Sequence, residues 1–397
     1  MLSPHSARTA EPSFLAAYAA GGMHCPSVGF VSTYPPTRCG IATFTASLRA
    51  AMDLPASGVV AVTDDPRGAQ SPPEVVAELV NGIPASLDEA ADALNTFDLV
   101  VVQHEFGIYG GADGCEVLDL VGQLESPAIL VLHTVLRSPS PRQRAIVEQL
   151  ATAADRVVVQ SDTARARLLE MHAIAPRDVR VIPHGATPNL STPARAPGRR
   201  PVILTWGLLG PSKGIEFVIE ALAELRDLDP APRYVVLGQT HPRVVEHQGE
   251  AYRSSLIAQA RTLGVDHLVE FEDRYVDTAA ILAWIRNADV VVLPYRSRDQ
   301  VVSGVLVEAL ASGKPVLATS FPHAVELLGE GSGIIVPHED ASAIAASLRV
   351  LLTDPVHARR ASAVARRQAQ GLFWASVGQT YRELVADVAQ TAAGAHR

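Results

Sequence analysis

The sequence predicts an α/β protein of two Rossmann-like domains, each built on a doubly wound parallel sheet. Short apolar runs alternate with helical stretches along most of the chain, which is typical of parallel βαβ units. A segment rich in Pro and Gly interrupts this alternation at residues 191–200, and 397 residues exceed what one hydrophobic core usually organises. Together these observations favour two domains.

We expect the first domain over residues 24–190. The apolar run at residues 99–103 is continuous, as in a strand buried on both faces. The expected strands are 28–32, 99–103, 128–133, 156–160 and 179–183, and the expected helices are 44–52, 142–153 and 163–171. Residues 1–23 hold a short apolar patch with no basic segment before it, so we expect a loose extension and not a signal peptide.

We expect the second domain over residues 198–372, after an interdomain linker at residues 191–200. Its expected strands are 202–206, 234–237, 268–271, 290–293, 316–318 and 333–336, and its expected helices are 214–227, 250–263, 277–287, 303–312, 322–328 and 341–353. The tail at residues 373–390 has apolar residues at helical spacing, which predicts a final amphipathic helix.

Composition argues against several classes of protein. The net charge is −9, whereas a nucleic-acid-binding surface needs a basic face to neutralise phosphates. Cys25, Cys39 and Cys115 show no metal-ligand spacing, so we expect reduced thiols in a cytoplasmic protein. No apolar stretch approaches the roughly 20 residues that a membrane span needs.

Polar residues follow several predicted strands of the first domain. In parallel sheets, ligands bind at the carboxyl ends of the strands. Gly40 precedes a helix, His104 and Glu105 end one strand, His133 ends another, and His184 lies in VIPHGA. A glycine before a helix is often ordinary turn chemistry, and a single histidine is often structural. Two histidines at the same edge of one sheet favour a functional site.

The second domain carries two loops that suit an anionic ligand. In ILTWGLLGPSKGIEF, backbone amides and Lys213 could meet a diphosphate ahead of a helix that starts near Gly214. In VVSGVLVEAL, Ser303 and Gly304 open a helix, and Glu308 follows one turn later, where its carboxylate could accept hydrogen bonds from ribose hydroxyls. A solvated helix face is the alternative for Glu308, but its neighbours are apolar.

These motifs resemble the large retaining glycosyltransferase family, glycosyltransferase family 4-like, that contains many mannosyl- and glucosyltransferases. The resemblance covers about residues 28–390 and is strongest at residues 202–337, in the Gly-rich loop, ADVVVLPY, GVLVEALASGKPVLAT and GIIVPHED. It implies a GT-B fold, in which two domains face a central cleft and a C-terminal helix, here residues 373–390, returns to the first domain.

The resemblance also implies roles for individual residues. Lys213, in the loop that begins at Gly207, would bind the donor diphosphate, and Glu308 would bind the donor ribose. His133 would reach the donor sugar near the reacting centre. The other implied site residues are the donor-binding Gly40, Arg274, Tyr275, Ser303, Gly304 and Val305 and the acceptor-side His104 and Glu105.

The chain departs from the family pattern at two positions. Gln300 stands where the family has the first Glu of its E-x7-E motif, and Leu208 stands where it commonly has Arg. Gln300 can hydrogen-bond sugar hydroxyls but cannot supply a carboxylate. Arg274, Arg296 and Arg298 are candidates for the missing positive charge. Because the mechanism usually proposed for the family is a same-face displacement, we expect the enzyme to be active.

We therefore expect a retaining, metal-independent hexosyltransferase without a cofactor. It would transfer mannose from GDP-mannose, or in second place glucose from UDP-glucose, to a glycan or other hydroxyl acceptor. The alternatives are a nucleotide-sugar epimerase, a glycoside phosphorylase or a non-catalytic nucleotide-sugar-binding protein. A lipid acceptor would bring peripheral membrane contact. The residues define neither the acceptor nor the oligomeric state.

Overall fold

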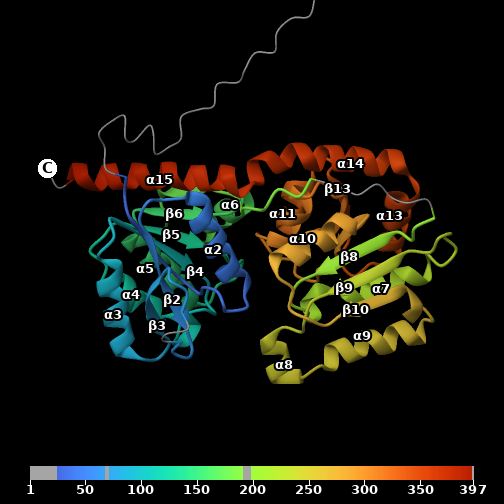
Figure 1. Ribbon diagram of the computed structural model, residues 1–397, viewed down its shortest axis with the longest axis horizontal. Helices are drawn as coiled ribbons and strands as arrows, with labels where there is room; N and C mark the ends of the chain where they lie inside the picture. The colour runs from blue at the N-terminus through green and yellow to red at the C-terminus, as the bar shows by residue number, and fades with distance from the viewer. Residues whose placement is uncertain (1–24, 68–70, 191–197, 396–397) are drawn as a thin grey trace, which may run out of the picture.

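The computed structural model describes residues 25–67, 71–190 and 198–395. The extension expected at residues 1–23 and residues 191–197 of the expected linker lie outside the described residues. The described chain folds around two separate parallel sheets, and the predicted fold class of two Rossmann-like domains is confirmed (Figure 1).

The first sheet has the strand order β3-β2-β1-β4-β5-β6-β7, with all its pairs parallel. Its strands are β1 (Val28–Ser32), β2 (Ser57–Thr63), β3 (Val75–Val80), β4 (Leu99–His104), β5 (Ala128–Leu132), β6 (Arg156–Val159) and β7 (Val179–Val181). The sequence analysis did not predict β2 and β3. The pairing of β1 with β2 on one side and with β4 on the other makes the end of β1 a topological switch point, where such sheets bind ligands.

The second sheet has the order β10-β9-β8-β11-β12-β13 and is also parallel. Its strands are β8 (Val202–Trp206), β9 (Arg233–Leu237), β10 (Val269–Glu272), β11 (Val290–Leu293), β12 (Val316–Thr319) and β13 (Gly333–Val336). The central strands β8, β11 and β12 are buried on both faces, as their continuous apolar sequences require. Here the switch point lies between β8 and β11.

Helices cover both faces of each sheet. The first domain contains α2 (Gly40–Met52), α3 (Pro84–Leu94), α4 (Glu116–Val121), α5 (Pro141–Ala153) and α6 (Asp162–Met171). Helix α2 begins earlier than expected because the Cys39 sulfur accepts a hydrogen bond from the Ala42 amide at 3.3 Å. Hydroxyl N-caps open α5 at Ser140 and α6 at Ser161.

The second domain and the tail contain the remaining helices. They are α7 (Ile215–Ala223), α8 (Pro242–Gln248), α9 (Ala251–Thr262), α10 (Thr278–Asn287), α11 (Gly304–Ala311), α12 (Pro322–Leu328), α13 (Ala341–Thr353), α14 (Pro355–Gln368) and α15 (Trp374–Ala395). The sequence analysis did not predict α8 and α14. Helix α7 is shorter than expected. No helix in the described part of the chain is long and apolar enough to cross a membrane.

The final helix packs on the first domain, although it follows the second domain in sequence. Figure 1 shows α14 and α15 along one side of the molecule, with α14 over the second domain and α15 over the first. Tyr381 of α15 is fully buried in a cluster with Phe30 of β1 and Phe44 of α2. The Arg382 guanidinium donates to the carbonyl oxygens of Ala51 and Met52, at 2.9 and 3.0 Å, at the end of α2.

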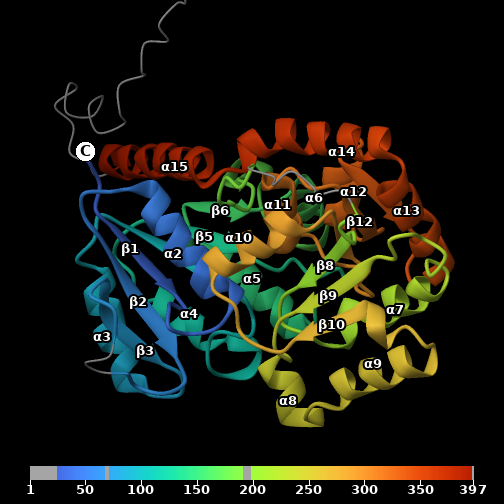
Figure 2. The ribbon, with the colours of Figure 1, turned by 45° about the vertical axis from the view of Figure 1, so that its right-hand side comes forward.

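Polar contacts join the two domains around the carboxyl ends of their strands. The Arg243 guanidinium of α8 donates to the Gly107 carbonyl oxygen at 3.0 Å, and Figure 2 shows α8 on the side of the second domain that faces the first. Ser161 donates to the Val301 carbonyl oxygen at 2.8 Å. The loops that follow the strands of both sheets therefore lie opposite one another, as a shared binding site requires.

Candidate functional site

The loop after β8 places Lys213 at the switch point of the second sheet. Gly207 and Gly214 have φ values of +120° and +62°, which favour glycine, and a Cβ on Gly214 would collide with the carbonyl oxygen of Pro294. This close approach brings the loop onto the end of β11. The Lys213 ammonium lies 4.3 Å from the centroid of the Tyr295 ring, within range for a cation–π interaction.

The two lysines of the chain, Lys213 and Lys314, have different environments. The Lys314 ammonium is buried and donates to the carbonyl oxygens of Arg286 and Ala288, at 2.7 and 2.8 Å, and burial lowers its pKa to about 8. Lys213 is half-buried and has no carboxylate partner within the described ranges. Its positive charge is therefore available to an anionic ligand.

Glu308 lies on α11 beside the end of β8. Its Oε2 accepts a hydrogen bond from the Trp206 indole nitrogen at 3.3 Å, and burial raises its pKa to about 7. Trp206 directly precedes Gly207, so one strand end positions both Glu308 and the Lys213 loop. Hydroxyl groups that donate to this carboxylate would favour its ionised form and lower its pKa.

The first turn of α11 has two backbone amides that no described residue uses. The Ser303 hydroxyl caps the helix by accepting from the Leu306 amide at 3.3 Å, and the Ser303 amide donates to Nδ1 of His323 at 2.9 Å. The Gly304 and Val305 amides have no hydrogen bond to a described residue. With the positive end of the helix dipole, these two amides suit an anionic oxygen.

Gln300 lies in the loop before α11. Its side-chain nitrogen donates to the Val302 carbonyl oxygen at 2.9 Å, and its backbone carbonyl oxygen accepts from the His323 backbone amide at 3.3 Å. The side chain is thus held against its own loop. A sugar hydroxyl could reach its Oε1, which accepts hydrogen bonds.

His133 lies between two glutamine side chains. Its Nε2 is 2.7 Å from the Gln103 amide oxygen, and its Nδ1 is 3.1 Å from the Gln160 amide nitrogen. As the amides are placed, Nε2 carries the proton and donates, while Nδ1 accepts. Burial is the main cause that lowers the pKa of His133 to about 3, so the ring is neutral at physiological pH. Both ring nitrogens are therefore occupied.

The acceptor-side pair differs in accessibility. His104 is fully buried, its ring nitrogens have no partner among the described residues, and burial lowers its pKa to about 4. Its ring packs edge-on against Phe106. Glu105 is half-buried, accepts a hydrogen bond from the Thr134 hydroxyl, and has its pKa raised by burial. Thr134 follows His133, so the loops after β4 and β5 are joined at this edge.

Gly40, Tyr275 and Arg274 lie at exposed positions. A Cβ on Gly40 would meet nothing within 4 Å, so this end of α2 is open. The Tyr275 ring lies 5.3 Å from the guanidinium of Arg38, which links the second domain to a loop of the first. Arg274 pairs with Glu272 at 3.2 Å.

The arginines that could replace the family's loop arginine are engaged to different degrees. Arg296 pairs with Glu216 at 3.1 Å and with Glu339 at 3.4 Å. Arg298 is exposed and has no hydrogen bond or ion pair with a described residue. Leu208 adds no charge beside Lys213. Arg274 is also paired, so Arg298 is the one of these three arginines whose charge is uncommitted among the described residues.

Several residues that shape the site were missed by sequence reasoning. They share a position at or just after a strand end or beside α11: Gln103, Gln160, Trp206, Tyr295 and His323. A search for every polar or aromatic residue at strand carboxyl ends would have found the first four. Nothing in the local sequence of His323 indicates that it accepts from Ser303.

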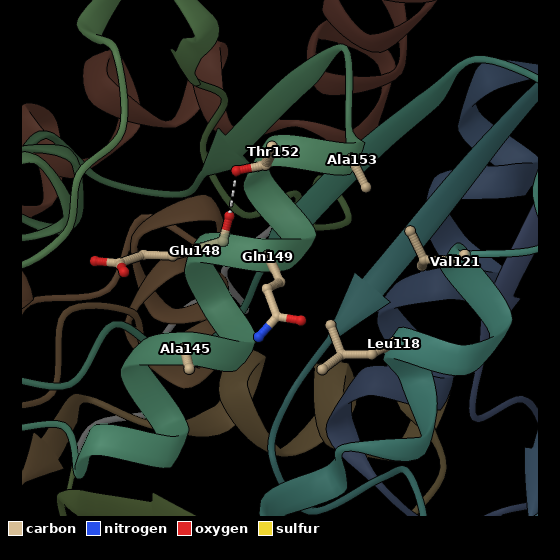
Figure 3. Close-up of a pocket in the computed structure, with 8 residues that line it drawn as sticks. Leu118, Val121, Ala145, Glu148, Gln149, Thr152 and Ala153 are labelled. Atoms are coloured by element: carbon tan, nitrogen blue, oxygen red, sulfur yellow. Dashed lines mark hydrogen bonds between the residues drawn. The ribbon is translucent and has the colours of Figure 1, made fainter.

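A groove on the outer surface lies apart from these residues. Figure 3 shows Leu118 and Val121 of α4 facing Gln149 and Ala153 of α5 across it. None of the predicted site residues lines this groove. Within the described ranges, no three His, Cys, Asp or Glu side chains are grouped as a metal site would need.

Two protein families together match almost all of the two domains. Residues 44–190 match the family described as Glycosyltransferase Family 4, and residues 188–368 match Glycosyl transferases group 1. The structure is similar to HepE from Anabaena, solved with UDP, with a TM-score of 0.75 and 18% sequence identity over 91% of this chain and 100% of HepE. These matches define the fold as GT-B.

Individual relatives also resemble the chain in sequence. The chain is 30% identical over 339 residues to the D-inositol 3-phosphate glycosyltransferase of Kineococcus radiotolerans, which covers 75% of this chain and 74% of that protein. It is 32% identical over 275 residues to the enzyme of the same name from Saccharomonospora viridis, over 64% and 62% of the two chains. The chain belongs to the GT-B glycosyltransferases of the family 4 type, which confirms the predicted family.

Proposed function

We propose that this glycosyltransferase transfers a hexose from a nucleotide-sugar donor to a hydroxyl acceptor, with retention of anomeric configuration and without a metal ion. One observation carries the proposal: the uncommitted amides of Gly304 and Val305 and the half-buried carboxylate of Glu308 share a helix beside the strand end that leads to Lys213. An anion site next to a hydroxyl-binding carboxylate fits the diphosphate and ribose of a nucleotide sugar.

The leaving nucleoside diphosphate is stabilised by charge and dipoles already in place. Lys213 supplies an ammonium, and α11 supplies two amides and its positive end. Preorganised donors of this kind contribute about 3–4 kcal/mol each to lowering a barrier. In this proposal these groups take the place of a metal ion in stabilising the leaving diphosphate.

The nucleoside binds along the same edge of the sheet in this proposal. Glu308 accepts hydrogen bonds from the ribose hydroxyls, and its raised pKa falls when they donate. Tyr275, which is 41% exposed, and Arg274 form the wall beside the nucleobase. Gly40, open on its outer side, lets the acceptor and donor approach α2 closely.

The transferred sugar lies between the two domains. His133 forms the floor of its subsite, and Gln300 offers an amide oxygen to a sugar hydroxyl. Glu105, and His104 beneath it, support the acceptor side. The acceptor oxygen bonds to the anomeric carbon on the face from which the diphosphate oxygen departs, and its proton passes to that phosphate oxygen. No carboxylate is needed opposite the anomeric carbon, in keeping with Gln300.

The proposal also concerns the identity of the donor. HepE has also been solved with UDP-glucose, at a TM-score of 0.72 and 17% identity over 91% of this chain and 100% of HepE. That neighbour favours a uridine donor, whereas the resemblance to mannosyl- and glucosyltransferases favours GDP-mannose. We propose UDP-glucose as the first donor to test and GDP-mannose as the second. The proposal includes a cytoplasmic location, which cell fractionation would test.

The deciding experiment offers both donors to the purified chain with a panel of alcohols, including D-inositol 3-phosphate, in EDTA and in magnesium. We expect a glycoside to form equally in both conditions, with the donor's anomeric configuration shown by proton NMR. Inversion or a strict magnesium requirement would contradict the proposed mechanism. Consumption of donor without acceptor would favour an epimerase, and a requirement for inorganic phosphate would favour a phosphorylase.

A further inference from the structure

His184 has an unused hydrogen-bond acceptor at the start of α11. Its Nδ1 is 2.7 Å from the carbonyl oxygen of Gly185, so Nδ1 carries the proton and donates. Burial lowers the pKa of His184 to about 4, so at neutral pH its Nε2 holds a bare lone pair. Nε2 has no hydrogen bond to any residue that the structure describes.

The ring of His184 has a fixed orientation. It packs against Phe44 of α2 with centroids 5.0 Å apart and against Trp374 of α15 at 5.8 Å. A Cβ on Gly185 would collide with the Trp374 ring, so the absence of a side chain at this position permits the packing. The imidazole is thus held by aromatic neighbours and one backbone bond, and it needs no rearrangement to meet a ligand.

The free nitrogen faces the first turn of α11. A Cβ on Gly304 would lie 2.9 Å from Nε2, closer than real side chains approach. Gly304 also carries one of the two uncommitted amides. The lone pair and the anion-binding amides therefore lie within the reach of one ligand, whose sugar and phosphate groups are adjacent.

His133 and His184 differ in what they can offer. Both rings pack edge-on against Phe44, with centroids 4.9 and 5.0 Å away. His133 has both nitrogens engaged by Gln103 and Gln160, so it must give up a bond before it can accept another. His184 needs no such exchange. Of these two imidazoles, His184 is the one prepared to accept a hydrogen bond from a hydroxyl.

We propose that Nε2 of His184 accepts a hydrogen bond from a hydroxyl of the transferred sugar and so helps to select the sugar of the donor. The inference rests on the proposed nucleotide-sugar donor and adds a residue to its sugar subsite. An acceptor alcohol has the same chemistry, but only the donor's sugar is joined to the phosphates that the Gly304 amide would hold.

The experiment compares a nucleotide with its sugar conjugate. Calorimetry would measure the dissociation constants of UDP and UDP-glucose, and of GDP and GDP-mannose, for the wild-type chain, His184→Phe and His184→Gln. Phe keeps a ring between Phe44 and Trp374 but cannot accept a hydrogen bond, whereas Gln can. His267→Phe, on the exposed outer side of the second domain, is the control. Thermal unfolding would verify that each variant is folded.

For His184→Phe we expect affinity for the nucleotide sugar to fall by about three- to tenfold, the range for one hydrogen bond, while affinity for the free nucleotide stays within about twofold. His184→Gln should recover part of the loss. An equal loss for both ligands, or no loss, would overturn the role of His184. Failure of the wild-type chain to bind either pair would instead contradict the proposed function, and this inference with it.

Discussion

The indole nitrogen of Trp206 donates a hydrogen bond to Oε2 of Glu308 across 3.3 Å. This bond joins the end of β8 to α11, through two residues that are 102 positions apart in sequence. The residue after Trp206 begins the loop that carries Lys213. This contact therefore helps to position the proposed ribose-binding group relative to the proposed diphosphate-binding group. It also partly stabilises the ionised form of Glu308, which burial disfavours.

Glu308 should make donor binding depend on pH. Its pKa is raised to about 7 in the free protein, and ribose hydroxyls favour its ionised form, so binding should release a proton. We expect UDP-glucose to bind about tenfold more weakly at pH 6 than at pH 8. Calorimetry measures this with UDP-glucose, whose diphosphate does not titrate in that range. Glu308→Gln should weaken binding and remove the pH dependence; a persistent slope would assign it to another group.

The same carboxylate should affect stability in the opposite sense. Its folded-state pKa of about 7 lies above the ordinary 4.5, so the unfolded chain ionises first and stability falls as pH rises from 4.5 to 7. Glu308→Gln keeps an acceptor for Trp206 and has no charge to bury. We expect its free energy of unfolding at pH 8 to exceed that of wild type by up to about 3 kcal/mol, with a smaller difference at pH 5.5. Urea unfolding at the two pH values would measure both differences. A pH-independent difference would disprove the linkage.

Lys213 should be the more reactive of the two lysines toward acetylation, and a bound donor should protect it. Because Lys314 is buried and bonded to two carbonyls, acetic anhydride should acetylate Lys213 first, and UDP should protect it. Mass spectrometry of peptides would measure both effects. Lys213→Ala should lower turnover by about 10²–10³. Lys213→Arg, which keeps the charge, is the matched variant. Undiminished donor affinity and turnover in Lys213→Ala would reject the diphosphate assignment.

Substitutions at Gly304 and His184 should have non-additive effects on the free energy of unfolding. A methyl group on Gly304 would press on the imidazole, so Gly304→Ala should cost about 1–3 kcal/mol. His184→Ala removes the ring, and in that background the Gly304 substitution should cost much less. Urea unfolding of the four proteins in this cycle would measure the coupling. Additive effects would mean that the two residues do not press on one another.

Glu326 forms an interdomain contact that should protect two backbone amides of α6 from hydrogen exchange. Its carboxylate oxygens accept from the amides of Asp162 and Thr163, at 3.0 and 2.9 Å, so the second domain caps α6 of the first. Glu326→Ala should speed hydrogen exchange of these two amides by about tenfold, because each loses a charge-assisted hydrogen bond. Glu89→Ala, at an exposed position on α3, is the control. Unchanged exchange rates would show that the contact does not persist in solution.

The sequence alone was enough for the fold class, the family and much of the chain order. Buried parallel strands are apolar throughout, so β4, β8 and β11 could be read from short windows. The strands β2 and β3 were missed, although β2 contains the run GVVAV, because no helical pattern between them marked a βαβ unit. Lys213 and Glu308 were chosen as candidates because Gly-rich loops and helix starts can be recognised in short stretches of sequence.

Only the tertiary structure decided which polar atoms are already satisfied. His133 and His184 look alike in sequence, each near the end of a strand, yet two glutamines occupy the first and leave the second with a free nitrogen. Ser303 likewise gives its amide to His323. Apolar periodicity is a local property that a strand or helix carries wherever it packs. Hydrogen-bond partners come from distant strands and helices, so they exist only once the sheets are assembled.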